Sequence, residues 1–111
     1  MILSDVIKGV KYTSILGPTD VNVASLTYDS RQVEADSCFF AVAGTVVDGH
    51  NFIAGALERG AKVVVCEHIP DEVKDADCTF VVVEDTNLAM GDIASNFYGN
   101  PSRELKVVGV T

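Results

Sequence analysis

Short, continuously apolar runs recur along this 111-residue chain and constrain its fold more than any other feature. They read CFFAVA, KVVVCE, TFVVV and LKVVGV, at residues 38–43, 62–67, 79–83 and 105–110. Runs this short, with successive β-branched residues and no helical periodicity, are typical of strands that are buried on both faces. Residues 21–28 alternate less regularly and predict one further strand that is half covered.

Helical patterns lie between these strands. Residues 49–61 carry apolar pairs four positions apart, and Gly60 stands where a C-terminal cap belongs. A second helix is expected to start at Asp85 or Thr86 and to stop at the Gly-Asn-Pro of residues 99–101. The side chains expected on one side of this helix are Leu88, Ala89, Ile93 and Phe97.

The N-terminal residues predict a short helix capped by Ser4, and Gly17-Pro18 predicts a turn. Strands that alternate with helices indicate an α/β fold. We expect three layers, in which a mixed or mainly parallel sheet of about four to five strands has helices on both faces.

Charge and composition limit the class of partner. Apolar residues make up 48% of the chain and charged residues 22%, as in a globular protein with a real core. The formal net charge of -8 provides no general basic surface for nucleic acid or for an anionic membrane. An anionic ligand would have to be held by local donors.

The three cysteines, Cys38, Cys66 and Cys78, form no Cys-x-x-Cys pair and no zinc-type array. Buried, reduced thiols are the favoured interpretation, which fits a cytoplasmic location. The first residues lack the features of a signal peptide, and no apolar run reaches the length of a membrane span.

Two polar clusters bracket the apolar run at residues 38–43. Tyr28-Asp29-Ser30-Arg31 follows one predicted strand, and residues 45–50 connect the next strand to a helix. If those strands are neighbours, both loops can face one cleft, where ligands of such sheets usually bind. The second loop leads into a helix N-terminus that favours an anion, but its glycines fit no phosphate-loop pattern. The residues alone favour a structural explanation, in which Asp48 caps the helix and Gly49 permits a turn.

Other chemistry is less well supported. Ser30 lies in no nucleophile elbow, and a local turn explains Asp29, Ser30 and Arg31 without catalysis. His50 and His68 are interpreted as a structural donor and a surface residue, and no metal site or catalytic residue is predicted. Glu84-Asp85 after a strand resembles a receiver-type acidic pocket, although a helix cap explains it more simply.

Several motifs together resemble the Mur ligases of peptidoglycan synthesis. The family pattern is roughly DSR, then GDLFVA, then G-x-x-x-D-G-H-x-F, and this chain carries DSR, FFAVAG and GTVVDGHNF, followed by FYGNPS and VVGVT. Similarity covers nearly the whole chain, and the combination is specific although each piece is not. The chain departs from the pattern at residues 36–38, where Asp-Ser-Cys replaces the usual Gly-Asp-Leu or Gly-Asp-Ile.

The resemblance implies a role for the first polar cluster and for the second. In that family the first domain holds the UDP part of a nucleotide-sugar peptide. Tyr28 and Ser30 would meet the uracil and ribose side. The residues implied to line the loop against the nucleotide are Thr45, Val46 and Val47. Supporting or loop-shaping roles are implied for Asp29, Arg31, Asp48 and His50.

The resemblance also implies a domain layout. Residues 1–84 would form the UDP-substrate-binding domain and residues 85–111 the start of a central ATP-binding domain. The family's glycine-rich ATP loop would follow Thr111, so the 111 residues alone are expected to be inactive and to bind no cofactor. The strand at residues 105–110 would lack its neighbours, and we expect it to dock on the sheet, pair with another copy or stay mobile.

The full enzyme would use ATP and Mg²⁺ to phosphorylate a D-glutamyl carboxylate, and the amine of a diamino acid would attack the acyl phosphate. Its substrate would be UDP-N-acetylmuramoyl-L-Ala-D-Glu. The C-terminal motifs favour the branch of the family that adds a diamino acid over the branch that adds a different amino acid or dipeptide. A stand-alone α/β interaction module without a nucleotide ligand is the alternative of a different class.

Overall fold

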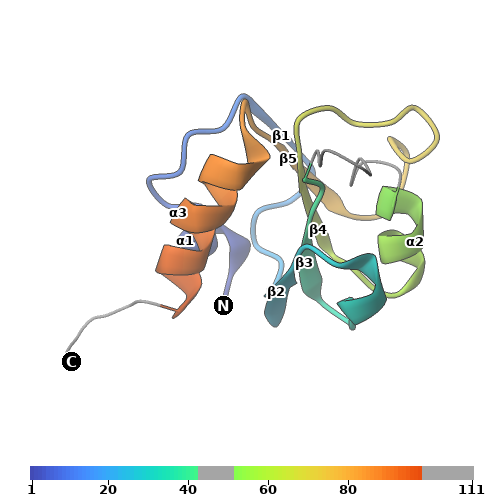
Figure 1. Ribbon diagram of the computed structural model, residues 1–111, viewed down its shortest axis with the longest axis horizontal. Coiled ribbons are helices and arrows are strands. Elements are labelled where there is room, and N and C mark those ends of the chain that lie inside the picture. The colour runs from blue at the N-terminus through green and yellow to red at the C-terminus, as the bar shows by residue number, and fades with distance from the viewer. Residues whose placement is uncertain (43–51, 99–111) are drawn as a thin grey trace.

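The computed structural model describes residues 1–42 and 52–98, which fold around one five-stranded sheet. The strand order is β1-β5-β4-β3-β2. The strands are β1 (Ser14–Leu16), β2 (Ser25–Thr27), β3 (Ser37–Phe40), β4 (Val63–Cys66) and β5 (Thr79–Val82). Strands β2 to β5 run parallel, and β1 joins β5 antiparallel. The carboxyl ends of the four parallel strands therefore meet at one edge of the sheet (Figure 1).

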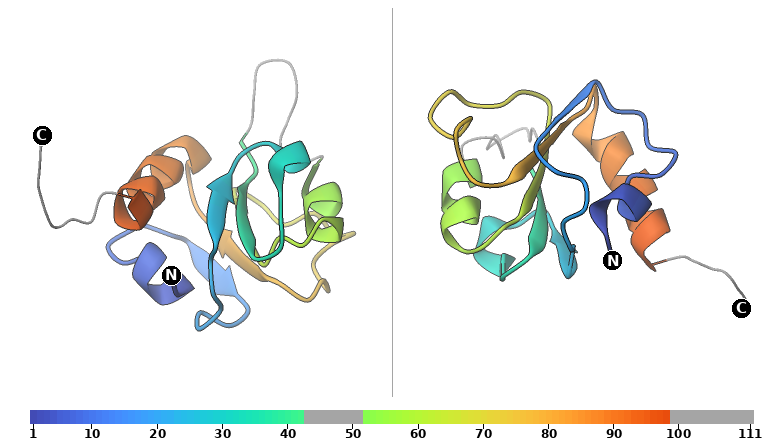
Figure 2. Two further views of the ribbon diagram at one scale, coloured as in Figure 1. Left: turned by 90° about the horizontal axis from the view of Figure 1, so that it is seen from below. Right: turned by 180° about the vertical axis from the view of Figure 1, so that it is seen from behind.

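Helices cover both faces of the sheet, so the predicted three-layer α/β fold is confirmed. Helices α1 (Leu3–Val6) and α3 (Thr86–Tyr98) pack on one face, and α2 (Ile53–Glu58) packs on the other, as the views in Figure 2 show. The 3-10 turn η1 (Ser30–Gln32) follows β2 and contacts α2. None of the helices in residues 1–42 and 52–98 is long and apolar enough to cross a membrane.

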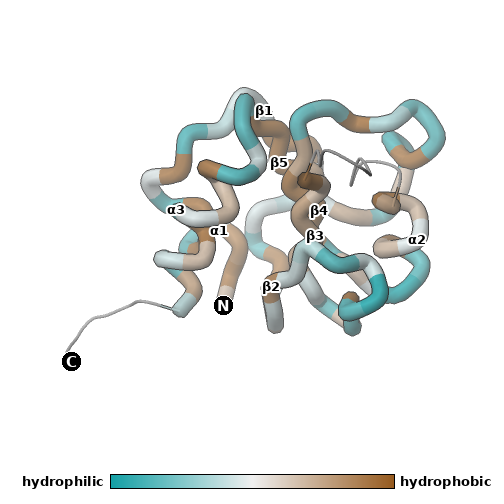
Figure 3. Tube along the Cα trace, in the orientation of Figure 1, coloured by the Kyte–Doolittle hydropathy of each residue, from teal (hydrophilic) through white to brown (hydrophobic). Residues whose placement is uncertain are grey.

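The continuous apolar runs are buried because both of their faces are covered. Along β3, Cys38 and Phe40 face α1 and α3, whereas Phe39 faces α2, and all three are almost fully buried. The valines of β4 divide in the same way between the two core clusters. Figure 3 shows this as apolar strands inside a more polar surface. The sheet thus has one apolar core on each of its two faces.

The predicted strands at residues 38–43, 62–67 and 79–83 correspond to β3, β4 and β5. The strand expected at residues 21–28 is shorter in the structure, where only β2 forms within that range. Strand β1 was not predicted, because the nearby Gly17-Pro18 indicated only a turn. Its hydrogen bonds to β5 arise from long-range pairing, for which residues 14–16 carry no local signal. The run at residues 105–110 lies outside the described residues.

Two predictions, one about α1 and one about α3, were wrong. Ser4 does not cap α1, because the segment after β1 satisfies its first amides: Leu3 N–H donates to the Val21 carbonyl, and Ser4 N–H donates to that of Thr19. Leu88 is 70% exposed, because the buried side of α3 passes through Ala89 and Ile93, one residue further round the helix.

Phe52 was expected to pair with Ala56 on the apolar side of a helix over residues 49–61. It instead occupies the N-cap position of α2 and remains 44% exposed, while Ile53 and Ala56 are buried. The expected start of this helix at Gly49 lies outside the described residues.

The end of α2 confirms the predicted cap at Gly60. Gly60 N–H donates to the Leu57 carbonyl and Ala61 N–H to that of Ala56, with Gly60 at φ 113°, which is a Schellman motif. Nearby, Asp36 adopts φ 64° in the turn before β3. This is the position at which the Mur ligase pattern has glycine, and Asp is one of the few other residues that tolerate this conformation. The departure at residues 36–38 therefore leaves the turn intact.

The three thiols are free, as predicted. Burial raises the pKa of Cys38 and of Cys66 to about 12, and that of Cys78 to about 11. All three stay protonated at neutral pH, which suits thiols that act as small apolar groups.

Candidate functional site

The first polar cluster follows β2 at the carboxyl edge of the sheet. Strand β2 lies beside β3 in parallel, with Thr27 opposite Phe39, so the predicted neighbourhood of these two strands is confirmed. The chain after β3 enters residues 43–51, which lie outside the described residues, and returns at Phe52. A ligand at this edge would meet the residues after β2 and the residue that opens α2.

The turn after β2 is fixed by hydrogen bonds within the cluster itself. Asp29 N–H donates to Thr27 Oγ1 at 3.1 Å, and Gln32 N–H donates to the Asp29 carbonyl at 2.9 Å. Asp29 Oδ1 also accepts the Arg31 N–H at 2.9 Å and so caps η1. The predicted local turn is therefore present, and Ser30 is the first residue of its 3-10 turn.

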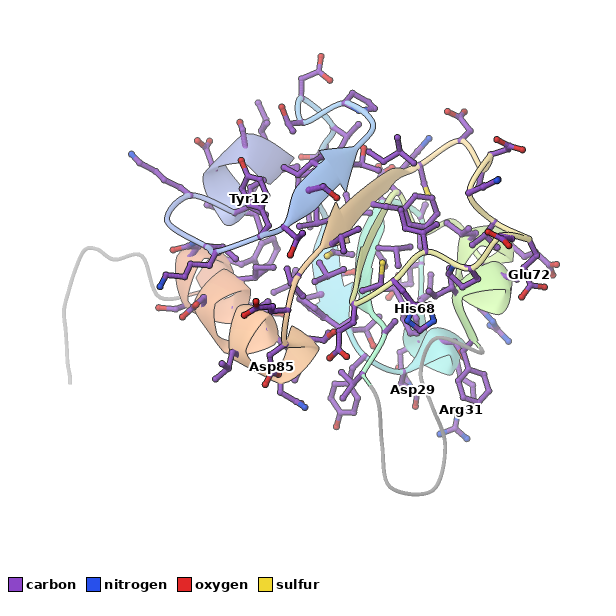
Figure 4. The ribbon with its side chains drawn as sticks, turned by 90° about the horizontal axis from the view of Figure 1, so that it is seen from above. Tyr12, Asp29, Arg31, His68, Glu72 and Asp85 are labelled. Carbon is purple, nitrogen blue, oxygen red and sulfur yellow. The ribbon has the colours of Figure 1, made fainter. Side chains whose placement is uncertain are left out.

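Asp29 and Arg31 form a two-pronged ion pair within this turn. Arg31 Nε donates to Asp29 Oδ1 at 3.1 Å, and Nη2 donates to Oδ2 at 3.0 Å. Figure 4 shows the two side chains together at the edge of the molecule. Hydrogen bonding from the Arg31 side chain lowers the pKa of Asp29, and the same contact raises the pKa of Arg31. Both groups stay charged through the physiological range.

A hollow of about 390 Å³ opens beside this turn. It is lined by Tyr28, Asp29, Ser30, Arg31 and Phe52. Tyr28 is 69% exposed, and Phe52 also presents much of its ring to solvent. Two partly exposed aromatic rings beside a hydroxyl and a guanidinium can stack on a flat ring and bind polar groups attached to it.

The structure thus brings four of the predicted residues to one hollow and adds Phe52. Sequence reasoning missed Phe52 because helical spacing assigned it to the core. Its position directly after the second polar loop was the signal that could have placed it at the site. The other predicted residues, Thr45, Val46, Val47, Asp48 and His50, lie outside the described residues, so their roles stay predictions.

The acidic pair after β5 has a structural explanation. Asp85 Oδ1 accepts the N–H groups of Asn87 at 2.9 Å and Leu88 at 3.3 Å, which confirms Asp85 as the cap of α3. Within residues 1–42 and 52–98, no three His, Cys, Asp or Glu side chains gather where they could hold a metal ion.

The fold and the hollow together define an α/β domain that presents an open hollow at the carboxyl edge of a largely parallel sheet. Comparison with known proteins gives this class a family. Residues 22–98 match the model of a protein family that is described as "Mur ligase family, catalytic domain". The chain belongs to the Mur ligase family, as its motifs predicted.

Curated relatives in this family resemble the chain over its full length. It is 50% identical over 111 residues to the UDP-N-acetylmuramoyl-L-alanyl-D-glutamate--2,6-diaminopimelate ligase of Cytophaga hutchinsonii. It is 39% identical over 111 residues to the protein of the same name from Bacteroides thetaiotaomicron. The chain spans only 23% of the length of each of these relatives. The predicted similarity to the branch that adds a diamino acid is confirmed.

Solved structures of the family share the fold. A crystal structure of MurF from Acinetobacter baumannii superposes with a TM-score of 0.73 at 24% identity, covering 86% of this chain and 20% of that one. MurF from Thermotoga maritima, in complex with ADP, gives a TM-score of 0.57 at 27% identity and covers 69% of this chain and 17% of that one.

Proposed function

We propose that this chain holds the UDP part of UDP-N-acetylmuramoyl-L-Ala-D-Glu for a ligase that adds 2,6-diaminopimelate to it. The observation that carries the proposal is the hollow beside Tyr28 and Ser30, in a chain that resembles ligases with that substrate in their name along its whole length. The volume is within the range of small-molecule sites. The family branch to which MurF belongs is a weaker candidate, because its solved members are only about a quarter identical to the chain.

The residues of the hollow suit different parts of the nucleotide. Tyr28 and Phe52 provide aromatic surfaces against which the uracil ring can stack. Ser30 provides a hydroxyl that can both donate and accept a hydrogen bond with the base or ribose. Thr45, Val46 and Val47 are proposed to contact the nucleotide from the neighbouring loop.

The ligation itself is assigned to the full-length protein, in which ATP would activate the D-glutamyl carboxylate for attack by the diamino acid. The 2,6-diaminopimelate ligases that resemble this chain are about four times as long, and a MurF structure in this family holds ADP. We propose the boundary between the UDP-binding domain and the ATP-binding domain at residues 84 and 85, and a cytoplasmic location. Mg²⁺, like ATP, is assigned to the full-length protein.

Titration of the 111-residue chain with UDP, followed by amide NMR, tests the proposal. We expect the largest shifts at Ser30, Thr45 and Phe52. Ser30→Ala should weaken binding by about 1–3 kcal/mol, because a buried hydrogen bond to the ligand is lost. Ser95→Ala, on the exposed side of α3, is the control and should leave UDP affinity unchanged. An absence of shifts up to millimolar UDP would instead favour an interaction module without a nucleotide ligand.

A further inference from the structure

We propose that Arg31 contacts the diphosphate of the bound nucleotide and that Asp29 positions its guanidinium for this contact. The inference rests on the proposed function and deepens it, because the family resemblance gave Arg31 only a loop-shaping role. It follows from the geometry of the ion pair, from the place of Arg31 in the hollow and from the charge of the chain.

The ion pair leaves much of the guanidinium free to donate. An arginine side chain carries five N–H groups in a planar fork. Asp29 accepts one from Nε at 3.1 Å and one from Nη2 at 3.0 Å. The remaining N–H groups point away from the carboxylate, and the fork that they form suits phosphate oxygens.

The carboxylate of Asp29 would not repel an anion strongly. Besides the two side-chain donors, its Oδ1 accepts the backbone N–H of Arg31 at 2.9 Å. The guanidinium therefore balances the charge of this carboxylate, and three N–H donors from one residue occupy the side that faces Arg31. The backbone contact also ties the orientation of the carboxylate, and through it the guanidinium, to the turn that contains Ser30.

The position of Arg31 suits a ligand contact better than a purely structural pair. Its side chain is 82% exposed and lines the same hollow as Tyr28 and Phe52. Among the five described residues that line the hollow, Arg31 alone is basic. Since the chain has a net charge of -8, long-range attraction cannot hold a diphosphate, and a local donor is required.

Comparing two probes, UDP and uridine, separates a phosphate contact from a structural role. With Arg31→Gln we expect UDP affinity to fall by about tenfold while uridine affinity stays unchanged, since one charge-assisted contact to the diphosphate is lost. Arg31→Lys should lose less, because it keeps the charge but not the fork. Lys8→Gln removes a positive charge from the turn after α1 and should change neither affinity.

The role of Asp29 has its own variant. Asp29→Asn keeps an oxygen that can cap the Arg31 N–H but weakens the hold on the guanidinium. UDP affinity should fall by a smaller factor than in Arg31→Gln, again without a change for uridine. Salt should also weaken UDP binding more in the unsubstituted chain than in Arg31→Gln.

These results distinguish a wrong phosphate contact from a wrong proposed function. If Arg31→Gln weakens UDP and uridine equally, or weakens neither, the phosphate contact is wrong while the nucleotide site stands. If the unsubstituted chain binds neither probe, the proposed function itself is wrong. Arg31 is highly exposed, so loss of the fold is not expected, and a thermal melt of each variant checks this.

Discussion

Individual residues show how burial and hydrogen bonding determine what a side chain contributes to the free energy of unfolding. Thr79 and Thr86 are both completely buried threonines, but their hydroxyls differ. Thr79 Oγ1 donates to the Pro18 carbonyl at 2.6 Å. Thr86 Oγ1 has no hydrogen-bond partner among the described residues, although the Thr86 N–H donates to Glu67 Oε2 at 3.1 Å. A buried hydroxyl without a partner is an uncompensated cost.

The same substitution should therefore have opposite effects at these two sites. Thr86→Val removes the unpaired hydroxyl and should raise the free energy of unfolding by about 1 kcal/mol. Thr79→Val leaves the Pro18 carbonyl without its donor and should lower it by about 1–2 kcal/mol. Urea denaturation measures both. Equal changes of the same sign would show that hydrogen bonding does not distinguish the two sites.

The residues after β2 show what sequence can and cannot predict at this scale. The sequence singled out the cluster from Tyr28 to Arg31, because a polar cluster directly after a strand is a visible signal, and the family resemblance then selected Tyr28 and Ser30. Phe52 and the partnership of Asp29 with Arg31 at the hollow needed the structure. Helical spacing placed Phe52 in the core, because its fit to that spacing outweighed its position directly after the second polar loop.

At the scale of elements, local patterns predicted the end of α2 and the start of α3 better than the start of α1. Gly60 and Asp85 lie at caps that residue type alone indicates. The first amides of α1 are satisfied by carbonyls from residues 19 and 21, which no helix signal reveals. Strand β1 was missed for a similar reason, since its existence depends on β5, more than sixty residues away along the chain.

The cap of α2 gives the element-scale prediction. A Cβ on Gly60 would lie 3.0 Å from the Ala35 Cα, at a φ of 113° that L-residues rarely adopt. Gly60→Ala should lower the free energy of unfolding by about 1–3 kcal/mol. Gly91→Ala is the matched control, because Gly91 lies inside α3 with open space around it. That variant should gain about 0.5–1 kcal/mol from helix propensity.

Chemical denaturation of the two glycine variants measures this predicted difference in stability. If Gly60→Ala is as stable as the unsubstituted chain, the turn before β3 must yield to the added methyl group, and the tight approach to Ala35 would not constrain the fold.

At the scale of the whole molecule, one sheet joins two apolar cores. The sequence predicted this arrangement well, because strands buried on both faces must be covered on both faces. Phe39 and Phe40 are neighbours in β3 that point into opposite cores, and each is 1% exposed. The pair therefore probes whether the two faces act as one folding unit.

Phe39→Ala and Phe40→Ala should each lower the free energy of unfolding by about 3–5 kcal/mol. Each variant should still unfold in one transition, with far-UV circular dichroism and tyrosine fluorescence changing together. Separate transitions in the Phe40→Ala variant would mean that the face covered by α1 and α3 can melt alone. Exposed Leu88→Ala is the control and should change stability by less than about 0.5 kcal/mol.

The pairing of β1 with β5, and the packing of α1 against α3, have a consequence for synthesis on the ribosome. The Asn96 side chain donates hydrogen bonds to the carbonyls of Val6 and Lys8, at 2.7 and 2.9 Å. Helix α1 and the residues after it thus complete these contacts only after residue 96 has emerged. During translation the apolar side chains of α1 are therefore fully covered only when α3 has been made.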